Sequence, residues 1–278
     1  MELKLGKLPP VIDKRTIPLK AILRLKLLPE LPPYYDNQEV LGVEDDFMFA
    51  NDQYGDCVKA ARAHQTLVFE AFEQGKQIEI IDQEVIDEYL DETGGADSGL
   101  VLLFSLKDWR NGGWDVGGKI YTIYAFASVD WKDHSEVKHC IHLLGGVNFG
   151  MSVYQTDIDQ FKAGEDWHLT GNDEEKLGGH GVYAYAYNED GVWGMTWGKC
   201  QFMTWEFWDA RVDEAYGIVD NINPWMADNS PLDVEKLNEQ LQEITEGRGE
   251  GNLGCLPPFS LFDLAKKTIK FLKKGLGW

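Results

Sequence analysis

Cysteine, long apolar runs and basic residues are scarce in this sequence, and each shortage excludes a class of protein. Four cysteines in 278 residues, with no CxxC pair, are too few for the disulfide framework of a small secreted domain. No apolar run approaches the ~20 residues that a membrane helix requires, so no transmembrane segment is expected. The 26 Lys and Arg against 47 Asp and Glu give a net charge of −21, which argues against nucleic acid as the main partner.

The charge is unevenly distributed along the chain. Residues 1–30 and residues 259–278 each carry a net charge of +4, which leaves −29 on residues 31–258. Two basic ends on an acidic body predict protein–protein contacts through residues 1–50 and 259–278. For the basic helix at 259–278, docking on a membrane surface or on nucleic acid stays open as an alternative.

Proline, glycine and charge divide the chain into four predicted segments. Most of the ten prolines fall in residues 1–50, which predicts an extended arm with one short helical piece. Residues 51–223 form the predicted domain. Residues 224–258 are predicted to be a linker because they end in a run of Gly and Glu, and residues 259–278 a basic amphipathic helix.

The hydrophobic period changes within the domain. Its first half has apolar residues at helical spacing, and helices are predicted at Asp56–Gln74, Asp82–Glu92 and Gly99–Arg110. The second half alternates like strands, and a loop rich in Asp and Glu is expected at Asp157–Glu175. Strands are predicted at Lys119–Val129, Val147–Tyr154, His180–Tyr187, Val192–Gly198 and Ala215–Val219, with helices at Ser135–Leu144, capped by Ser135, and at Trp205–Glu214. This order predicts an α+β fold.

Cys57 and His180 are the candidate catalytic pair. Cys57 opens the first predicted helix, where free N–H groups and the helix dipole stabilise a thiolate. His180 follows two glycines at the start of a strand, a rigid place from which an imidazole can reach a thiolate on another element. Taken alone, a cysteine at a helix start is more often a packing residue than a catalytic one, and a histidine after two glycines is about as ambiguous.

The order and context of these residues resemble the papain-like cysteine peptidases. The strings that carry the resemblance are NDQYGDC at Asn51–Cys57, GGHGV at Gly178–Val182, and the Trp-Gly pair after Thr196. More narrowly, Ala50–Cys57 is similar to the GND-x-x-GDC motif of a poorly characterised group from bacteria and their phages. The resemblance implies a helical half that carries the Cys and an antiparallel β half that carries the His.

The resemblance also implies a role for each site residue. Cys57 would be the nucleophile, His180 the general base, and the Asn51 side chain with the Cys57 N–H the oxyanion donors. The family's orienting position falls on Met195, and Thr196 would orient the imidazole in its place if the strand register allows. Two residues would border the substrate cleft, Trp197 and Gly179. The chain departs from the family pattern in two places, with Met195 where an orienting Asn is usual and Asn51 where a Gln is usual.

Two functions from different classes follow. The first is a papain-like cysteine hydrolase, a peptidase or a peptidoglycan amidase, that acts through a Cys thioester on a peptide or amide substrate. The narrower motif implies that it is phage-encoded. The second is a catalytically inactive pseudoenzyme that serves as a structural protein of a phage virion. No metal and no cofactor are expected, because His139, Cys140 and His142 lack further ligands nearby. The expected location is the cytoplasm, or the virion if the chain is phage-encoded.

Overall fold

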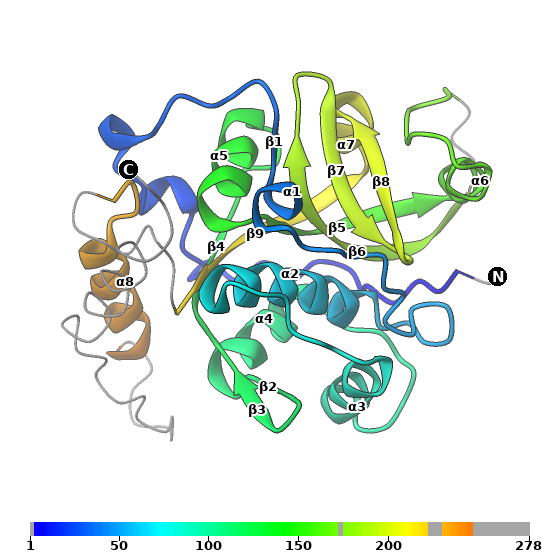
Figure 1. Cartoon of the computed structure of the whole chain (residues 1–278), viewed down its shortest axis with the longest axis horizontal. Coiled ribbons are helices and arrows are strands. Elements are labelled where there is room, and N and C mark those ends of the chain that lie inside the picture. The colour runs from blue at the N-terminus through cyan, green and yellow to red at the C-terminus, as the bar shows by residue number, and fades with distance from the viewer. Residues whose placement is uncertain (1–2, 172–174, 222–229, 247–278) are drawn as a thin grey trace.

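The computed structural model describes residues 3–171, 175–221 and 230–246 (Figure 1). The long helix α2 (Cys57–Gln74) crosses the middle of the molecule, with other helices on one side and a curved sheet on the other. Residues Cys57 to Ala71 of this helix are all buried, because it packs against both halves. It ends at Gly75, whose φ of 68° is the left-handed conformation that glycine adopts without strain.

The helical half contains two more helices and a small hairpin. Helices α3 (Asp82–Thr93) and α4 (Leu102–Asn111) pack beside α2, and strands β2 (Trp114–Val116) and β3 (Lys119–Tyr121) form the hairpin. Their apolar side chains form one of two hydrophobic cores. The sequence predicted all three helices to within three residues at each end.

The other half is built on a seven-stranded antiparallel sheet in the order β4-β9-β5-β6-β7-β8, with β1 paired to β6. The strands are β1 (Tyr35–Asp36), β4 (Ile123–Ser128), β5 (Val147–Tyr154), β6 (Lys176–Tyr187), β7 (Gly191–Thr196), β8 (Lys199–Thr204) and β9 (Val212–Asp220). The central position of β5 buries five of its residues in succession, Val147 to Met151. This sheet confirms the α+β expectation of helices first and antiparallel strands second.

Short helices surround the sheet. They are α1 (Asn37–Leu41), α5 (His134–Leu144), α6 (Gln155–Ala163), α7 (Trp205–Arg211) and α8 (Val234–Glu246), with 3-10 turns at Leu19–Ala21 and Leu25–Leu27. Helices α5 to α7 contribute to the second hydrophobic core, together with Leu232, Val234 and Leu237 from the α8 region. Within the described residues no helix is both long enough and apolar enough to cross a membrane.

Three local predictions were wrong, and one strand was missed. Asp133 caps α5 in place of Ser135, since its carboxylate accepts the N–H groups of Ser135 and Glu136. Part of the predicted acidic loop is the helix α6, whose Ile158 and Phe161 are buried. Strand β8 went unpredicted. Part of the predicted linker 224–258 is the helix α8, so the Gly-rich run that follows this helix does not make the whole segment a linker. The predicted basic helix 259–278 lies outside the described residues.

Residues 3–50, predicted to be an extended arm, lie along the body of the protein. Ile17, Leu19 and Ile22 are buried in the core of the sheet half. At the start of the chain, residues 3–8 (hereafter the N-terminal segment) run between the two halves, as the blue trace beside α2 in Figure 1 shows. Contact of this region with another protein stays a prediction.

Candidate active site

Cys57 lies at the first turn of α2, buried where that helix meets the sheet. Its sulfur accepts a hydrogen bond from the backbone N–H of Gly181, at 3.3 Å. Gly181 follows His180 on β6, so the sheet residue next to the histidine touches the cysteine directly. A Cβ at Gly181 would lie only 3.2 Å from the Cα of Val58, so glycine permits this close approach of strand and helix.

His180 is held on two sides. Its Nε2 lies 2.5 Å from the hydroxyl oxygen of Thr196, and the indole of Trp197 stacks on its ring with centroids 3.9 Å apart. Nδ1 is buried and has no hydrogen-bond partner within the structure described. If Nε2 carries the proton and donates it to Thr196, Nδ1 is left as the acceptor. This arrangement suits a general base.

The turn between β7 and β8 gives Trp197 its position. Thr196 pairs with Lys199, and the two residues between them, Trp197 and Gly198, have φ values of 45° and 67°. Positive φ at both central residues is the pattern of a type I′ hairpin turn, in which Asn or Asp usually precedes Gly. A tryptophan in the left-handed region is strained, and here it is the residue that covers His180.

Both members of the pair are neutral in this structure. Burial raises the pKa of the Cys57 thiol to about 11, although the N–H groups of Gly181 and Gly6 partly oppose the rise. Burial lowers the pKa of His180 to about 3. An ion pair between thiolate and imidazolium would therefore form only after water or a substrate replaces what now covers the site.

Asn51 precedes Cys57 by six residues and stabilises the intervening loop. Its Nδ2 donates to the Tyr54 carbonyl at 3.2 Å and to Asp56 Oδ1 at 3.0 Å. Because both hydrogens are used, one of these bonds must break before Asn51 can serve as an oxyanion donor. The burial of Asp56 raises the pKa of its carboxyl to about 8. A carboxyl that is largely protonated near neutral pH disfavours the adjacent thiolate less than a full charge would.

The N-terminal segment covers this pair. The Gly6 N–H donates to the Cys57 sulfur. On the helical side, the Leu100 N–H donates to the Gly6 carbonyl at 2.8 Å. On the sheet side, the Lys7 N–H donates to the Gly179 carbonyl at 3.1 Å and the Trp197 indole N–H donates to the Lys4 carbonyl at 3.1 Å. Backbone hydrogen bonds thus fix the segment on both sides.

The side chain of Lys7 is buried beside the segment. Its Nζ lies 2.7 Å from Asp213 Oδ1 and 3.0 Å from Glu214 Oε1, and 1% of the side chain is exposed. Its aliphatic stem passes over Gly150, where an added Cβ would lie 1.9 Å from Lys7 Cε. Asp213, Glu214 and Gly150, together with Gly179, are called the Lys7 site below.

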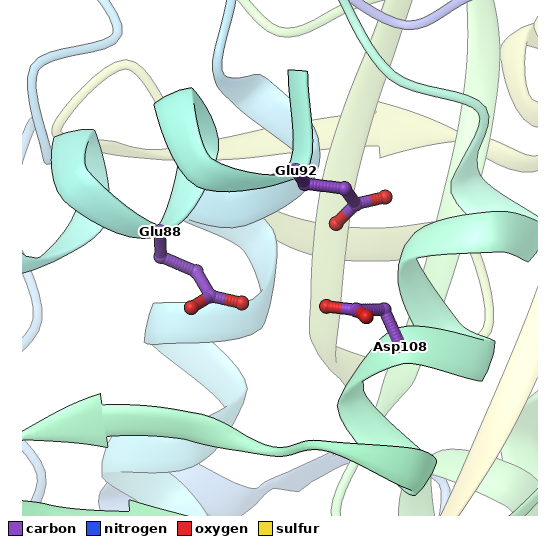
Figure 2. Close-up of side chains that lie close together, drawn as sticks. All are labelled: Glu88, Glu92 and Asp108. Atoms are coloured by element: carbon purple, nitrogen blue, oxygen red, sulfur yellow. The ribbon is translucent and has the colours of Figure 1, made fainter. Parts of the chain in front are cut away.

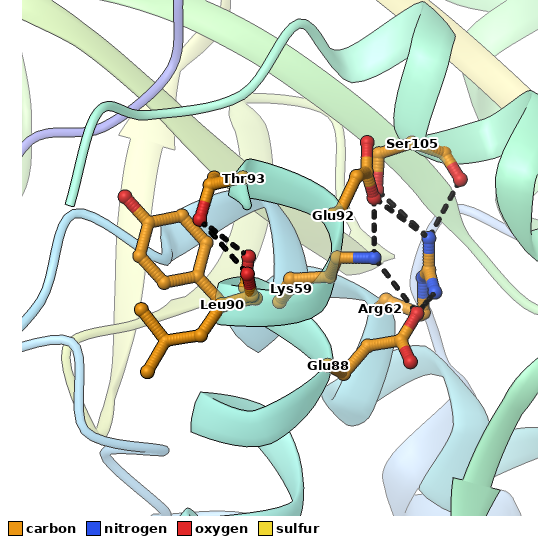
Figure 3. A network of polar contacts seen from close by, with 8 residues as sticks. Lys59, Arg62, Glu88, Leu90, Glu92, Thr93 and Ser105 are labelled. Carbon is orange, nitrogen blue, oxygen red and sulfur yellow. Dashed lines mark hydrogen bonds and ion pairs between the residues drawn. The ribbon is translucent and has the colours of Figure 1, made fainter. Parts of the chain in front are cut away.

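A second acidic cluster lies in the helical half. The carboxylates of Glu88, Glu92 and Asp108 lie close together, and Figure 2 shows them facing one another from α3 and α4. Lys59 Nζ binds Glu88 at 2.9 Å and Glu92 at 2.5 Å, and Arg62 Nη1 binds Glu88 at 2.7 Å (Figure 3). Two buried cations already neutralise most of this charge, so the cluster stabilises helix packing and offers no argument for a metal ion.

The structure brings together Cys57, His180, Thr196, Trp197 and Gly179, and it places Asn51 in the loop just before Cys57. Sequence reasoning missed Gly6, Lys7, Asp213 and Glu214. No local sequence pattern distinguishes Gly6 or Lys7 as a site residue. One signal was present for the others, because two successive carboxylates at the start of a buried strand are uncommon enough to require a cation.

Comparisons with known proteins agree on the fold. Xylellain, a cysteine protease from Xylella fastidiosa, superposes with a TM-score of 0.63 at 16% identity over 79% of this chain and 97% of that one. Procathepsin B S9 from Trypanosoma congolense gives 0.56 at 13% identity over 78% and 87%, and a Carica candamarcensis cysteine protease in complex with E-64 gives 0.52 at 13% over 69% and 100%. No family model and no curated protein matches. The fold is that of papain-like cysteine proteases, which confirms the predicted fold class.

Proposed function

We propose that this protein is a cysteine peptidase of the papain type, with Cys57 as nucleophile, His180 as base and Thr196 as the residue that orients the imidazole. The observation that carries the proposal is the His180 ring, held by Thr196 on one edge and by Trp197 on one face with Nδ1 unpartnered, while the N–H of the next residue, Gly181, donates to the Cys57 sulfur. A phage origin rests on the sequence motif, a place in a virion on that motif and the basic ends, and action on peptidoglycan amides on the shared Cys and His chemistry.

The chemistry follows from the proton positions. Nδ1 of His180 takes the Cys57 thiol proton while Nε2–H donates to Thr196, and the thiolate attacks the substrate carbonyl carbon. The backbone N–H of Cys57 donates to the oxyanion, as does Asn51 once one of its two bonds is released. His180 then returns the proton to the departing amine, which leaves a thioester. Water, deprotonated by the same nitrogen, hydrolyses the thioester and restores the thiol.

The N-terminal segment blocks the site without being a substrate. At Gly6 the group that faces the sulfur is an N–H, and the carbonyl of the same residue is turned toward Leu100. A thiolate needs a carbonyl carbon, so the segment in this orientation cannot be cleaved. We therefore expect the intact chain to be latent and its activity to appear when the segment leaves.

The test opens the site within the full chain. A Cβ at Gly6 would lie 1.6 Å from the Gly55 carbonyl oxygen, a contact that forces the segment out, so Gly6→Ala is the opening variant. We expect Gly6→Ala to hydrolyse a fluorogenic peptide mixture and to be alkylated at Cys57 by iodoacetamide far faster than the unaltered chain. Adding Cys57→Ala should lower hydrolysis by at least ~1,000-fold.

The control for the orienting role is a pair of substitutions at Thr196. In the Gly6→Ala background, Thr196→Val should lower kcat roughly tenfold because it removes the oxygen that holds Nε2, while Thr196→Ser should retain most of the rate. An opened chain that is alkylated at Cys57 but hydrolyses no peptide would instead support the alternative of an inactive papain-fold structural protein.

A further inference from the structure

The Lys7 site has the features of a subsite for a cationic side chain. Asp213 and Glu214 both reach Lys7 Nζ although they are consecutive residues of β9, and consecutive side chains of a strand normally point to opposite faces. A bulge explains this arrangement. Gly150 pairs with Glu214 and the next residue, Met151, pairs with Val212, so Asp213 is the extra residue. Bulges re-aim a side chain in this way.

The depth of the site comes from glycine. Any side chain at Gly150 would overlap the Lys7 stem, since its Cβ would come within 1.9 Å of Cε and 2.5 Å of Cδ. The Glu214 carboxylate is further held by the Tyr216 hydroxyl, which donates to Oε2 at 3.1 Å. The site therefore has a long slot for an aliphatic stem and two fixed carboxylates at its end. A long cationic side chain fits this shape and charge, whereas an apolar one leaves two partly buried carboxylates without a partner.

The position of the site relative to the sulfur follows from chain direction. Gly6 lies on Cys57 and Lys7, the next residue, fills the site. The segment presents an N–H to the sulfur, whereas a substrate presents a carbonyl. Reversing the direction of an extended strand exchanges the places of N–H and C=O groups. A substrate therefore runs opposite to the segment, and the residue that enters the Lys7 site is the one preceding the residue at the scissile bond.

We propose that Asp213, Glu214 and Gly150 make this protein select peptides with lysine or arginine at the residue before the scissile residue. This proposal rests on the proposed peptidase function. Lys7 is then an internal mimic of the preferred side chain, bound in the reverse direction. The proposal adds a substrate class to the reaction.

One experiment measures the preference with covalent probes. The Gly6→Ala chain is treated with three dipeptidyl chloromethyl ketones whose second residue is glycine and whose first is lysine, leucine or glutamate. We expect inactivation of Cys57 by the lysine probe to be at least tenfold faster than by the leucine probe, and by the glutamate probe to be slowest. Adding Asp213→Asn and Glu214→Gln should remove most of the lysine advantage, because the lysine rate falls and the leucine rate does not, and an unchanged midpoint of urea unfolding shows that the variant is folded.

A second experiment uses the segment itself as the ligand and needs no catalysis. In the full chain, Lys7→Met keeps the length of the side chain and removes its charge, and Lys7→Arg keeps the charge. Protection of Cys57 from iodoacetamide should fall at least tenfold in Lys7→Met and persist largely in Lys7→Arg. Equal protection in Lys7→Met and the unaltered chain, or equal rates with the lysine and leucine probes, would overturn the subsite. An opened chain that reacts selectively with the lysine probe but hydrolyses no peptide would contradict the peptidase function and leave the subsite standing.

Discussion

Two lysines of this protein are buried against pairs of carboxylates, and they differ in what holds them there. The side chain of Lys59 is 0% exposed and binds Glu88 and Glu92, while that of Lys7 is 1% exposed and binds Asp213 and Glu214. Lys59 and its partners lie on α2 and α3, helices that are adjacent in the chain and share a core. Lys7 lies on a segment that is held by hydrogen bonds, one isolated bridge and the partly buried Leu3 and Leu5, and its carboxylate partners are over 200 residues away.

The comparison teaches that the burial of an ion pair does not reveal its role. The Lys59 cluster cannot lose its cation without separating two packed helices, so it belongs to the fold. The Lys7 site can lose its cation when six residues lift away, and water then reaches the carboxylates. The same chemistry thus stabilises the fold in one place and fills a binding site in the other.

The largest expected effect on stability comes from breaking the Lys59 cluster. Glu88→Ala removes a carboxylate that binds both Lys59 and Arg62 and leaves Glu92 as their remaining ion-pair partner, so we expect a loss of about 3 kcal/mol in the free energy of unfolding, the low end for breaking a buried pair. Urea denaturation measures it. Asp91→Ala, an exposed carboxylate on the same helix, is the matched control and should change the stability by less than about 0.5 kcal/mol. A loss below about 1 kcal/mol for Glu88→Ala would remove the distinction between the clusters.

Hydrogen exchange tests whether the N-terminal segment opens on its own. We expect the amides of Lys7 and Leu8, which donate to Gly179 and Leu100, to exchange at least roughly 100-fold faster than those in the middle of α2. The physical reason is that the segment packs the partly buried Leu3 and Leu5 against the core of the sheet half but contributes none of the fully buried residues of either core. The intact chain is labelled under native conditions, and mass spectrometry of its peptides then measures the exchange of both regions in one sample. Equal rates would show that the segment unfolds only with the whole protein.

Asp56 differs from both lysine sites because it is a buried carboxyl that forms no ion pair with a cation in the described residues. Burial raises its pKa to about 8 from 3.8, so between those pH values the folded state holds a proton that the unfolded state has released. Its contribution to stability is therefore complete below about pH 4 and is lost as the pH rises toward 8. We expect the unaltered chain to lose about 1–3 kcal/mol more than Asp56→Asn between pH 5 and 7.

His180 changes the stability in the opposite direction over part of the same pH range, and comparing the two chains removes its contribution. The lowered pKa of His180, about 3, means that the unfolded state binds the extra proton between pH 3 and its ordinary value, so that this residue makes stability rise with pH there. Because His180 is present in both chains, the difference between them isolates Asp56. Parallel curves for the two chains in urea denaturation would mean that Asp56 is already ionised at pH 5.

The smallest expected effect is that of salt. At 1 M NaCl the screening length falls to about 3 Å, and screening acts on charges that water can reach. Asp213 is 26% exposed, so we expect iodoacetamide to alkylate Cys57 of the intact chain a few-fold faster in 1 M than in 0.1 M salt. A free thiol such as glutathione supplies the control for the reagent. No change with salt would indicate that the backbone hydrogen bonds alone hold the segment.

Sequence reasoning was strongest where the signal was local. Helix α2 with Cys57 at its start followed from apolar spacing and a terminal glycine, and the β6–β7 hairpin followed from its Asn-Glu-Asp-Gly turn. Helix α8 went unpredicted because the glycines after it dominated the interpretation. Its Val234, Leu237 and Leu241 do have helical spacing, and that signal could have revealed it.

The contents of the site were beyond such reasoning. Lys7 meets Asp213 only because β9 carries a bulge and because the segment passes between the two halves of the fold. Neither feature has a local pattern in the sequence. The basic charge of the first thirty residues predicts docking on another protein, whereas Lys7, Lys20 and Arg24 form ion pairs with carboxylates of the acidic body of the same chain.

The stretch that joins the N-terminal segment to the body has a kinetic consequence. Residues 9–16 form no helix or strand, Ile12 in their midst is 90% exposed, and the chain becomes buried again only at Ile17. A tethered blocker acts at an effective concentration in the millimolar range, which dilution of the protein does not reduce. One cut in this stretch would make rebinding a bimolecular event, and at micromolar protein the freed peptide would diffuse away.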